Sequence, residues 1–135
     1  MSFRIIFIMN DTDAYRLEAV LALASAFPGS LRTGDIARQR GVPPKFLARL
    51  LAELARRGVV VTARGPRGGA RLARRPDEVK VGEVLLAATA YGKGGTATRW
   101  LAARLQEAER RTLAPLSVAR LLGVERQGSE PQYEI

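Results

Sequence analysis

Apolar residues recur with helical spacing over residues 13–27, where the sequence predicts the first helix. Candidate N-caps stand at its start, namely Asp11, Thr12 and Asp13. A Pro-Gly pair directly after Phe27 ends the helix. The positions that fall near one face are Leu17, Val20, Leu21, Leu23 and Ala24. We expect this face to be buried in a core.

Two shorter helices are predicted next, separated by Gly41. The second spans residues 33–40 with Thr33 as a plausible N-cap, and the third begins at Pro43 or Pro44. Proline suits the first turn of a helix because its missing N–H is no loss there. The inward face of the third helix is expected to hold Phe46, Leu47, Leu50, Leu51 and Leu54. Its outward residues are Lys45, Ala48, Arg49, Ala52, Glu53 and Arg56.

A pair of short strands follows the third helix. Residues 59–62 are three valines and a threonine, residues 71–73 form the return strand, and Gly, Pro and Arg cluster between them at residues 64–69. A helix, a turn, a second helix and a two-stranded wing, in this order and at this spacing, are typical of a winged helix-turn-helix. Each signal alone is weak, so the prediction depends on their order.

Further helices are predicted after the wing. We expect a short apolar helix over residues 81–90, a long helix over residues 96–111 and a last apolar segment over residues 113–122. The predicted fold class is therefore mainly α with a small β-wing, a winged helix-turn-helix domain plus a long C-terminal helix. The predicted units are an N-terminal extension (1–10), the winged helix domain (11–90), a glycine-rich link (91–95), C-terminal helices (96–123) and a frayed tail (124–135).

The positive charge of the chain is concentrated in one block. The 135 residues carry a net charge of +9, but residues 31–75 alone hold twelve Lys or Arg and two acids, a local net charge of +10. A basic block in an otherwise balanced chain indicates a polyanionic partner, which is most simply nucleic acid. A G+C-rich genome would favour Arg over Lys, but it would not explain the clustering.

The third helix of such a domain enters the major groove of DNA. The residues that it would bring to base edges are Lys45, Ala48 and Arg49. The wing arginines, which would hold the DNA backbone or enter the minor groove, are Arg64, Arg67 and Arg71. The starts of the second and third helices complete the predicted contacts to double-stranded DNA, with Thr33, Pro43 and Pro44. The alternative is that these residues form an ordinary solvated surface.

Two residue types are missing from the sequence, cysteine and histidine. Their absence excludes disulfides, thiolate zinc sites, cysteine nucleophiles, histidine bases and histidine metal sites. We therefore expect no enzyme and no metal site. The opening apolar run is far shorter than the roughly 20 residues that span a membrane, and no cleavage site follows it, so we expect a cytoplasmic protein.

Several of these motifs resemble the Rrf2 family of bacterial winged-helix transcription regulators. The resemblance covers about residues 15–123 and is most specific in the wing and in the helix that follows it. The matching segments are Tyr15 with the first helix, Asp35-Ile36-Ala37, Gly41-Val42, Lys45-Phe46-Leu47, Leu50, Leu54, Gly58-Val59, Arg64-Gly65-Pro66, Gly68-Gly69, Arg71-Leu72-Ala73 and Val81-Gly82-Glu83-Val84-Leu85. Ala70 departs from the pattern, because an aromatic residue commonly follows the two glycines.

The resemblance implies a sequence-specific DNA-binding transcriptional regulator that acts as a homodimer on a pseudo-palindromic operator. Residues 96–123 would be its dimerisation helices. The apolar stripe expected at the dimer interface is Trp100, Leu101, Leu105 and Ala108. A ligand pocket is the alternative interpretation of this stripe.

Many members of the family hold an iron–sulfur cluster on three cysteines after the wing. Here residues 89–96 contain no cysteine, and Ala14 stands where some members offer an acidic ligand. The resemblance therefore implies a cluster-free member without a cofactor, whose signal is a small molecule, a partner protein or none. The alternative functions are a winged-helix adaptor for protein interactions and a sensor that binds a metabolic enzyme.

Overall fold

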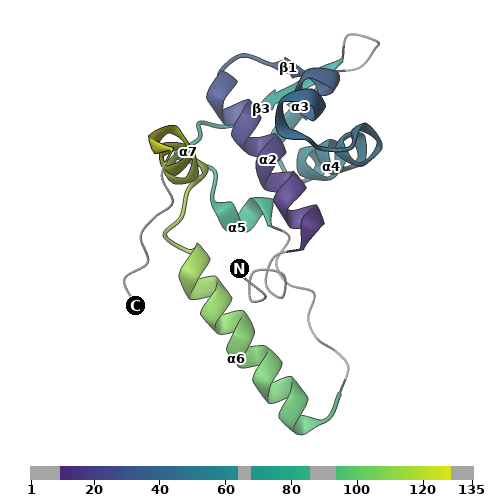
Figure 1. The fold of residues 1–135 in the computed structure, drawn as a ribbon. Coiled ribbons are helices and arrows are strands. Elements are labelled where there is room, and N and C mark those ends of the chain that lie inside the picture. Colours follow the sequence, from purple (N-terminus) through teal and green to yellow (C-terminus); the bar gives the residue numbers. More distant parts are fainter. Residues whose placement is uncertain (1–9, 64–67, 86–93, 129–135) are drawn as a thin grey trace.

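The computed structural model describes residues 10–63, 68–85 and 94–128, which form a helical body with a three-stranded sheet and one protruding helix (Figure 1). The helices are α2 (Asp11–Ala26), α3 (Thr33–Arg40), α4 (Pro44–Arg56), α5 (Val81–Val84), α6 (Thr96–Leu113) and α7 (Val118–Gln127). The strands are β1 (Leu31–Arg32), β2 (Val60–Thr62) and β3 (Gly69–Leu72). The predicted fold class, mainly α with a small β-wing, is confirmed.

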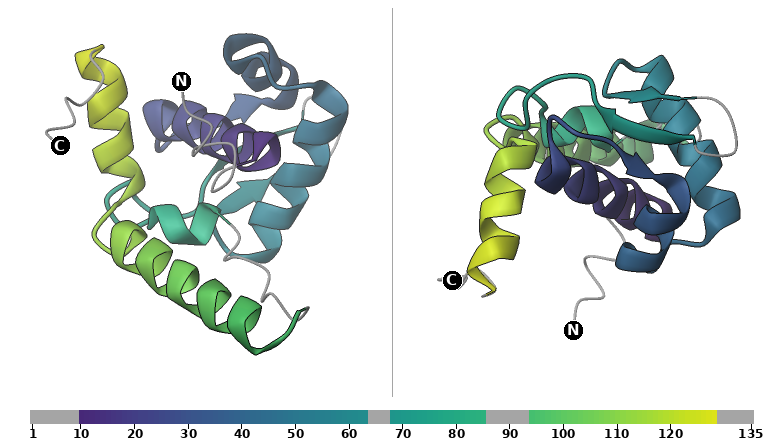
Figure 2. Two further views of the ribbon diagram at one scale, coloured as in Figure 1. Left: turned by 60° about the horizontal axis from the view of Figure 1, so that its bottom comes forward. Right: turned by 90° about the horizontal axis from the view of Figure 1, so that it is seen from above.

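The helix α2 is the centre of the body. It packs against α3, α4, α7 and β3, and Figure 2 shows these elements around it. Its start differs from the predicted caps, because the Asn10 side chain accepts a hydrogen bond from the Asp13 N–H at 2.8 Å. The Asp13 carboxylate in turn accepts one from the Asn10 N–H, which completes a capping box. The fully buried residues of α2 are Ala19, Val20, Ala22 and Leu23.

The helix-turn-helix is formed by α3 and α4. The chain turns at Gly41, whose φ of 66° lies in the left-handed region that favours glycine. Pro44 is the first residue of α4, as predicted. The predicted cap at Thr33 is wrong, because Thr33 is already the first residue of α3 and Arg32 precedes it without a side-chain cap. The buried face of α4 consists of Leu47, Leu50, Leu51 and Leu54.

The wing is a three-stranded antiparallel sheet in the order β1-β3-β2. Leu31 lies opposite Ala70, and Val60 lies opposite Leu72. Two strands were predicted, so β1 is an addition, and the return strand begins earlier than predicted, at Gly69. A Cβ atom on Gly69 would lie 2.2 Å from the Leu31 carbonyl oxygen. Only glycine therefore allows β3 to approach β1 this closely.

The ends of the chain also differ from the prediction. The helix α5 ends at Val84, and most of the rest of the predicted helix over residues 81–90 lies outside the described residues, as does nearly all of the N-terminal extension. The helix α7 begins after Ser117, whose hydroxyl accepts a backbone N–H of the first turn, and it runs to Gln127. Residues 124–127 are therefore helical, where a frayed tail was predicted. This helix packs on α2.

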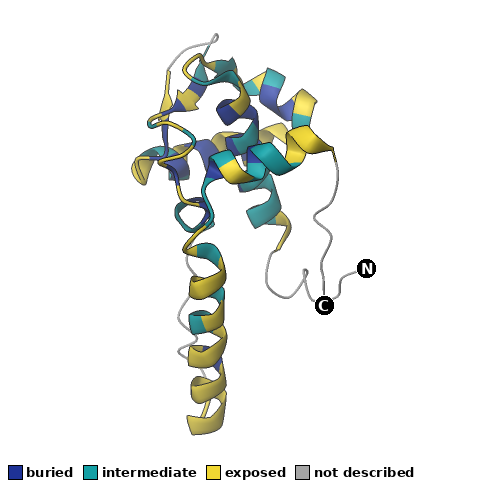
Figure 3. Cartoon of the chain, turned by 90° about the vertical axis from the view of Figure 1, so that its left-hand side faces the viewer, coloured by how far each residue is buried: buried dark blue, intermediate teal, exposed yellow. Residues whose placement is uncertain are grey.

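The helix α6 protrudes from the rest of the molecule, and most of its residues are exposed (Figure 3). It runs to Leu113, slightly beyond the predicted end at Arg111. Its main contact with the other elements is with α5. We call α6 the arm and the other described elements the body. Within the described ranges, no helix combines the length and the apolar character needed to cross a bilayer.

Candidate nucleic-acid interface

One side of α4 is exposed and positively charged. Lys45, Ala48 and Arg49 are exposed, and they alternate with the buried leucines so that the helix has one side in the core and one at the surface. In the part of the chain that the structure describes, neither Lys45 nor Arg49 forms an ion pair. This side of α4 is therefore open to an anionic partner.

Several other cations of the basic block are paired with acids from outside the block. Arg40 lies 3.1 Å from Glu18 and also pairs with Glu125, and Arg74 lies 2.6 Å from Glu83. The local net charge of +10 therefore overstates the free charge. The described cations of the block without an acidic partner lie on or beside α4, β1 and β3, and they are Arg32, Lys45, Arg49, Arg56, Arg57 and Arg71.

Two of these paired groups, Arg40 and Glu83, have a shifted pKa. The hydrogen bond from Arg74 lowers the pKa of the Glu83 carboxyl, and partial burial opposes this shift. The hydrogen bond to Glu125 is the main cause that raises the pKa of Arg40, again against partial burial. Both shifts favour the charged form of the group, the Glu83 carboxylate and the Arg40 cation, and each group lies beside an oppositely charged side chain. These pairs position elements of the body rather than attract an anion.

The Phe46 ring lies beside the basic residues of α4. It was predicted to be buried, but it is 39% exposed. The Arg49 guanidinium carbon lies 5.0 Å from the centroid of the ring, which is within cation–π range. Phe46 also contacts the Tyr15 ring of α2. The two ring centroids lie 6.2 Å apart, and the ring planes are tilted by 49°. Phe46 thus joins a core helix to a surface cation.

A buried arginine connects α4 to α2. Arg16 is 7% exposed, and its guanidinium donates to the Asp13 carboxylate at 2.8 Å and to the Glu53 carboxylate at 3.1 and 3.2 Å. Because Glu53 belongs to α4, this interaction fixes α4 relative to α2. The sequence did not predict it, since a single arginine in an apolar helix carries no signal of its partner on another helix.

The wing contributes one described cation of the three predicted. Arg71 is exposed on β3, while Arg64 and Arg67 lie outside the described residues. The strand β2 pairs with β3 and packs against α4, so it connects the wing to α4. At the helix starts, Pro43 and Pro44 are exposed and Thr33 is half-buried.

The arm exposes the predicted apolar stripe. Trp100, Leu101 and Leu105 are 60%, 52% and 59% exposed, and Ala108 is exposed as well. The Arg104 guanidinium carbon lies 4.9 Å from the centroid of a Trp100 ring. The stripe is therefore left at the surface of a single chain.

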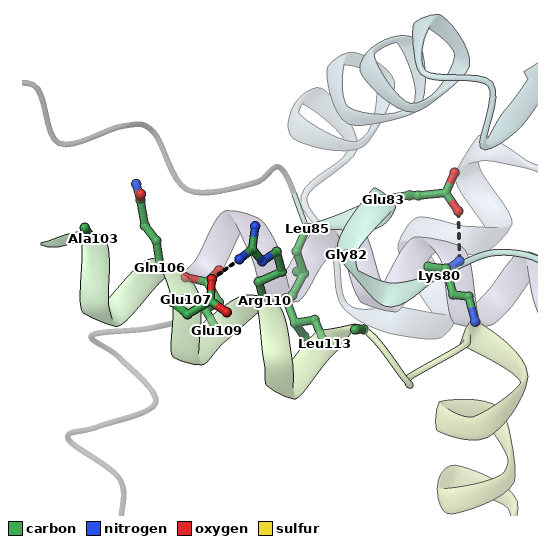
Figure 4. A pocket seen from close by; sticks show the side chains of 11 residues that line it. Lys80, Gly82, Glu83, Leu85, Ala103, Gln106, Glu107, Glu109, Arg110 and Leu113 are labelled. Carbon is green, nitrogen blue, oxygen red and sulfur yellow. Dashed lines mark hydrogen bonds and ion pairs between the residues drawn. The ribbon is translucent and has the colours of Figure 1, made fainter.

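A cavity of about 600 Å³ opens where the arm meets α5 (Figure 4). Its wall combines the apolar Leu85 and Leu113 with the charged Glu107 and Arg110, which pair with each other. None of the residues that line it comes from α4 or from the described strands of the wing. The cavity is thus separate from the basic surface.

A helix-turn-helix followed by a β-wing, with unpaired cations on both, defines a winged-helix protein. The sequence model of the Rrf2 family, described as an iron-dependent transcriptional regulator, matches residues 9–123. The chain therefore belongs to the Rrf2 family of transcriptional regulators, as the motifs in the sequence indicated.

Individual relatives agree with this assignment. The HTH-type transcriptional regulator IscR of Aliivibrio salmonicida is 38% identical over 80 residues, which are 58% of this chain and 48% of the relative. IscR of Cronobacter sakazakii is 32% identical over 95 residues, which are 64% of this chain and 59% of the relative. The chain thus spans about half the length of the curated relatives it matches.

Solved structures show the same fold. The structure of T. potens IscR aligns with a TM-score of 0.73 and 25% identity over 91% of each chain. CymR, the global cysteine regulator of B. subtilis, aligns with a TM-score of 0.66 and 22% identity over 85% of this chain and 95% of its own. The second similarity concerns the fold alone.

The family description raises the question of iron. The sequence contains no cysteine and no histidine, so it lacks the usual ligands of an iron–sulfur cluster. Among the described residues, no group of three or more carboxylates is placed to hold a metal ion. These residues do not fit a cysteine-ligated cluster, and the function proposed below does not depend on one.

Proposed function

We propose that this protein is a homodimeric, sequence-specific DNA-binding transcriptional regulator that works without an iron–sulfur cluster. The observation that carries the proposal is the exposed side of α4, where Lys45 and Arg49 have no acidic partner within the described residues. The corresponding helix of a helix-turn-helix enters the major groove. There arginine and lysine suit guanine, and an apolar side chain such as Ala48 suits the thymine methyl group.

The wing would hold the DNA beside the groove that α4 reads. Arg71 is exposed on β3, and Arg64 and Arg67 extend the same basic segment in the sequence. Arginines at a wing contact phosphates or enter the minor groove, and such contacts add affinity without reading much sequence. Thr33 and Pro43 would lie near the backbone at the starts of their helices.

The arm is the proposed dimer interface. Large apolar side chains on the exposed helix, such as Trp100 and Leu105, are typical of a surface that another chain covers. A two-fold dimer would present two α4 helices to a pseudo-palindromic operator, with half-sites about 34 Å apart. Without cluster ligands, control would come from a small molecule or a partner protein, or the protein would bind constitutively.

The salt dependence of binding tests the proposal. A dimer that makes roughly six to ten phosphate contacts should lose about 10³–10⁵-fold in affinity between 50 and 200 mM salt. Arg49→Ala should reduce discrimination between operator variants, whereas Arg71→Ala should weaken all duplexes by a similar factor. Fluorescence anisotropy with an operator chosen by in vitro selection measures the salt dependence and the effects of both variants.

A near-zero salt slope would contradict DNA binding and would favour a protein-interaction adaptor. If Arg71→Ala changed sequence preference and Arg49→Ala lowered affinity uniformly, the base-reading and backbone-holding roles would be reversed. Protein that sediments as a monomer, with and without the operator, would contradict the proposed dimer.

A further inference from the structure

We propose that Phe46 is a positioning residue that holds the Arg49 guanidinium ready to read a base. The inference rests on the proposed DNA-binding function and assigns a new role within that surface. Phe46 and Arg49 are three residues apart on α4, so their side chains lie on the same face of the helix. The guanidinium carbon lies 5.0 Å from the centroid of the Phe46 ring.

The Phe46 ring is itself held in place. Its neighbour Tyr15 is half-buried on α2 and packs against the hydrophobic core, with the two ring centroids 6.2 Å apart. The adjacent Leu47 is fully buried, which fixes the backbone of this turn. The ring is therefore a rigid surface on which a long side chain can rest, even though 39% of Phe46 is exposed.

Arg16 removes the carboxylate that would otherwise compete for Arg49. Glu53 stands four residues after Arg49, which is the spacing of an ion pair within a helix. Its carboxylate instead accepts hydrogen bonds from Arg16 at 3.1 and 3.2 Å. Within the described residues the Arg49 guanidinium contacts the Phe46 ring and pairs with no carboxylate. Neighbouring side chains thus leave this cation uncompensated.

A ring below the guanidinium leaves the donors of Arg49 available. An arginine presents its five N–H donors in the plane of the guanidinium, and stacking on an aromatic ring uses the face of that plane. Bidentate bonds to guanine O6 and N7 need the in-plane donors. An arginine whose guanidinium rests over a ring, as Arg49 does over Phe46, has also lost part of its rotamer freedom before binding, so less is lost when it docks on the base.

The test compares variants at Phe46 on the operator selected for the wild-type protein. The position that Arg49 reads is first identified as the base pair at which Arg49→Ala loses discrimination. Phe46→Leu should lower discrimination at that base pair by about two- to fivefold, the size expected from loss of an exposed cation–π contact. Phe46→Tyr keeps the ring and should stay within about twofold of the wild type. In an Arg49→Ala background, Phe46→Leu should have no further effect there.

A second readout needs no DNA. Ring current from Phe46 should shift the Arg49 side-chain protons upfield in the NMR spectrum, and Arg49→Lys identifies these signals. The shift should disappear in Phe46→Leu and persist in Phe46→Tyr. Phe46→Met serves in place of Phe46→Leu if circular dichroism shows that the leucine variant is unfolded.

The outcomes separate the two proposals. Wild-type protein that discriminates through Arg49, with equal discrimination in Phe46→Leu, would overturn the role of Phe46 and leave DNA binding intact. Unshifted Arg49 signals in the wild type would also overturn it. Wild-type protein that binds no duplex at low salt would overturn the proposed function, and the role of Phe46 would fall with it.

Discussion

The body and the arm place the same kinds of apolar side chain in opposite surroundings. In the body, Leu47 and Leu54 are fully buried, because α4 packs against α2, α3 and β2. In the arm, Leu101 and Leu105 are 52% and 59% exposed, because α6 meets the body chiefly at α5. An apolar stripe with helical spacing therefore identifies an amphipathic helix, while its neighbours decide whether the stripe is core or surface.

The largest expected difference between the two regions is in the cost of removing one leucine. Leu54→Ala should lower the free energy of unfolding by about 2–5 kcal/mol, because it leaves a cavity in the core. Leu105→Ala should change the free energy of unfolding of the monomer by less than about 0.5 kcal/mol, because most of the side chain is already exposed to water. Urea unfolding at concentrations that keep the protein monomeric measures both values.

The same pair of variants tests what covers the arm. In sedimentation at higher concentration, Leu105→Ala should weaken self-association, whereas Leu54→Ala should affect it only through stability. Equal losses of stability in the two variants would show that the arm packs on its own chain in solution. Unchanged association in Leu105→Ala would remove this part of the arm from the dimer interface.

The sequence predicted the elements that have strong local signals. The helix α3 has the predicted bounds, since Gly41 supplies the left-handed residue that ends it, and α4 begins at Pro44. The strand β1 was missed because two residues have no period of their own. It forms through contact with β3 at Gly69, a residue far away in the sequence.

For the site, the charge count predicted a basic surface but not which cations are free. That depends on acids that are distant in sequence, as Glu125 is from its partner Arg40. The Phe46 ring likewise contacts a residue that is distant in sequence, Tyr15 of α2. Spacing along one helix places Lys45 and Arg49 on a common side, but it does not show what lies across from them. The DNA contacts themselves stay predictions.

A pair of glycines sharpens the comparison within the body. Gly69→Ala should lower the free energy of unfolding by about 1–3 kcal/mol, because its new Cβ would meet the Leu31 oxygen and force β1 away from β3. Gly34→Ala is the matched control, since an added Cβ there has no heavy atom within 4 Å and the residue lies in α3. It should be neutral or stabilising by up to about 1 kcal/mol. Equal losses in thermal unfolding would mean that packing at Gly69 is not the cause.

The smallest expected effect tests whether α5, at the foot of the arm, unfolds together with the body. Arg74 lowers the pKa of Glu83 below its ordinary value of 4.5, so the pair contributes stability above that value and loses it as the pH falls through the folded pKa. The contribution should be below about 1 kcal/mol, because both side chains are partly exposed. Glu83→Gln should therefore be less stable than the wild type at pH 7, and this difference should shrink towards pH 3 in urea unfolding. Asp77→Asn, which removes an exposed carboxylate partner of Arg75, is the surface control and should show a weaker trend. No difference between Glu83→Gln and the wild type at pH 7 would mean that α5 opens with the arm before the rest of the body unfolds, and a constant non-zero difference would mean that the charge of Glu83 is not its cause.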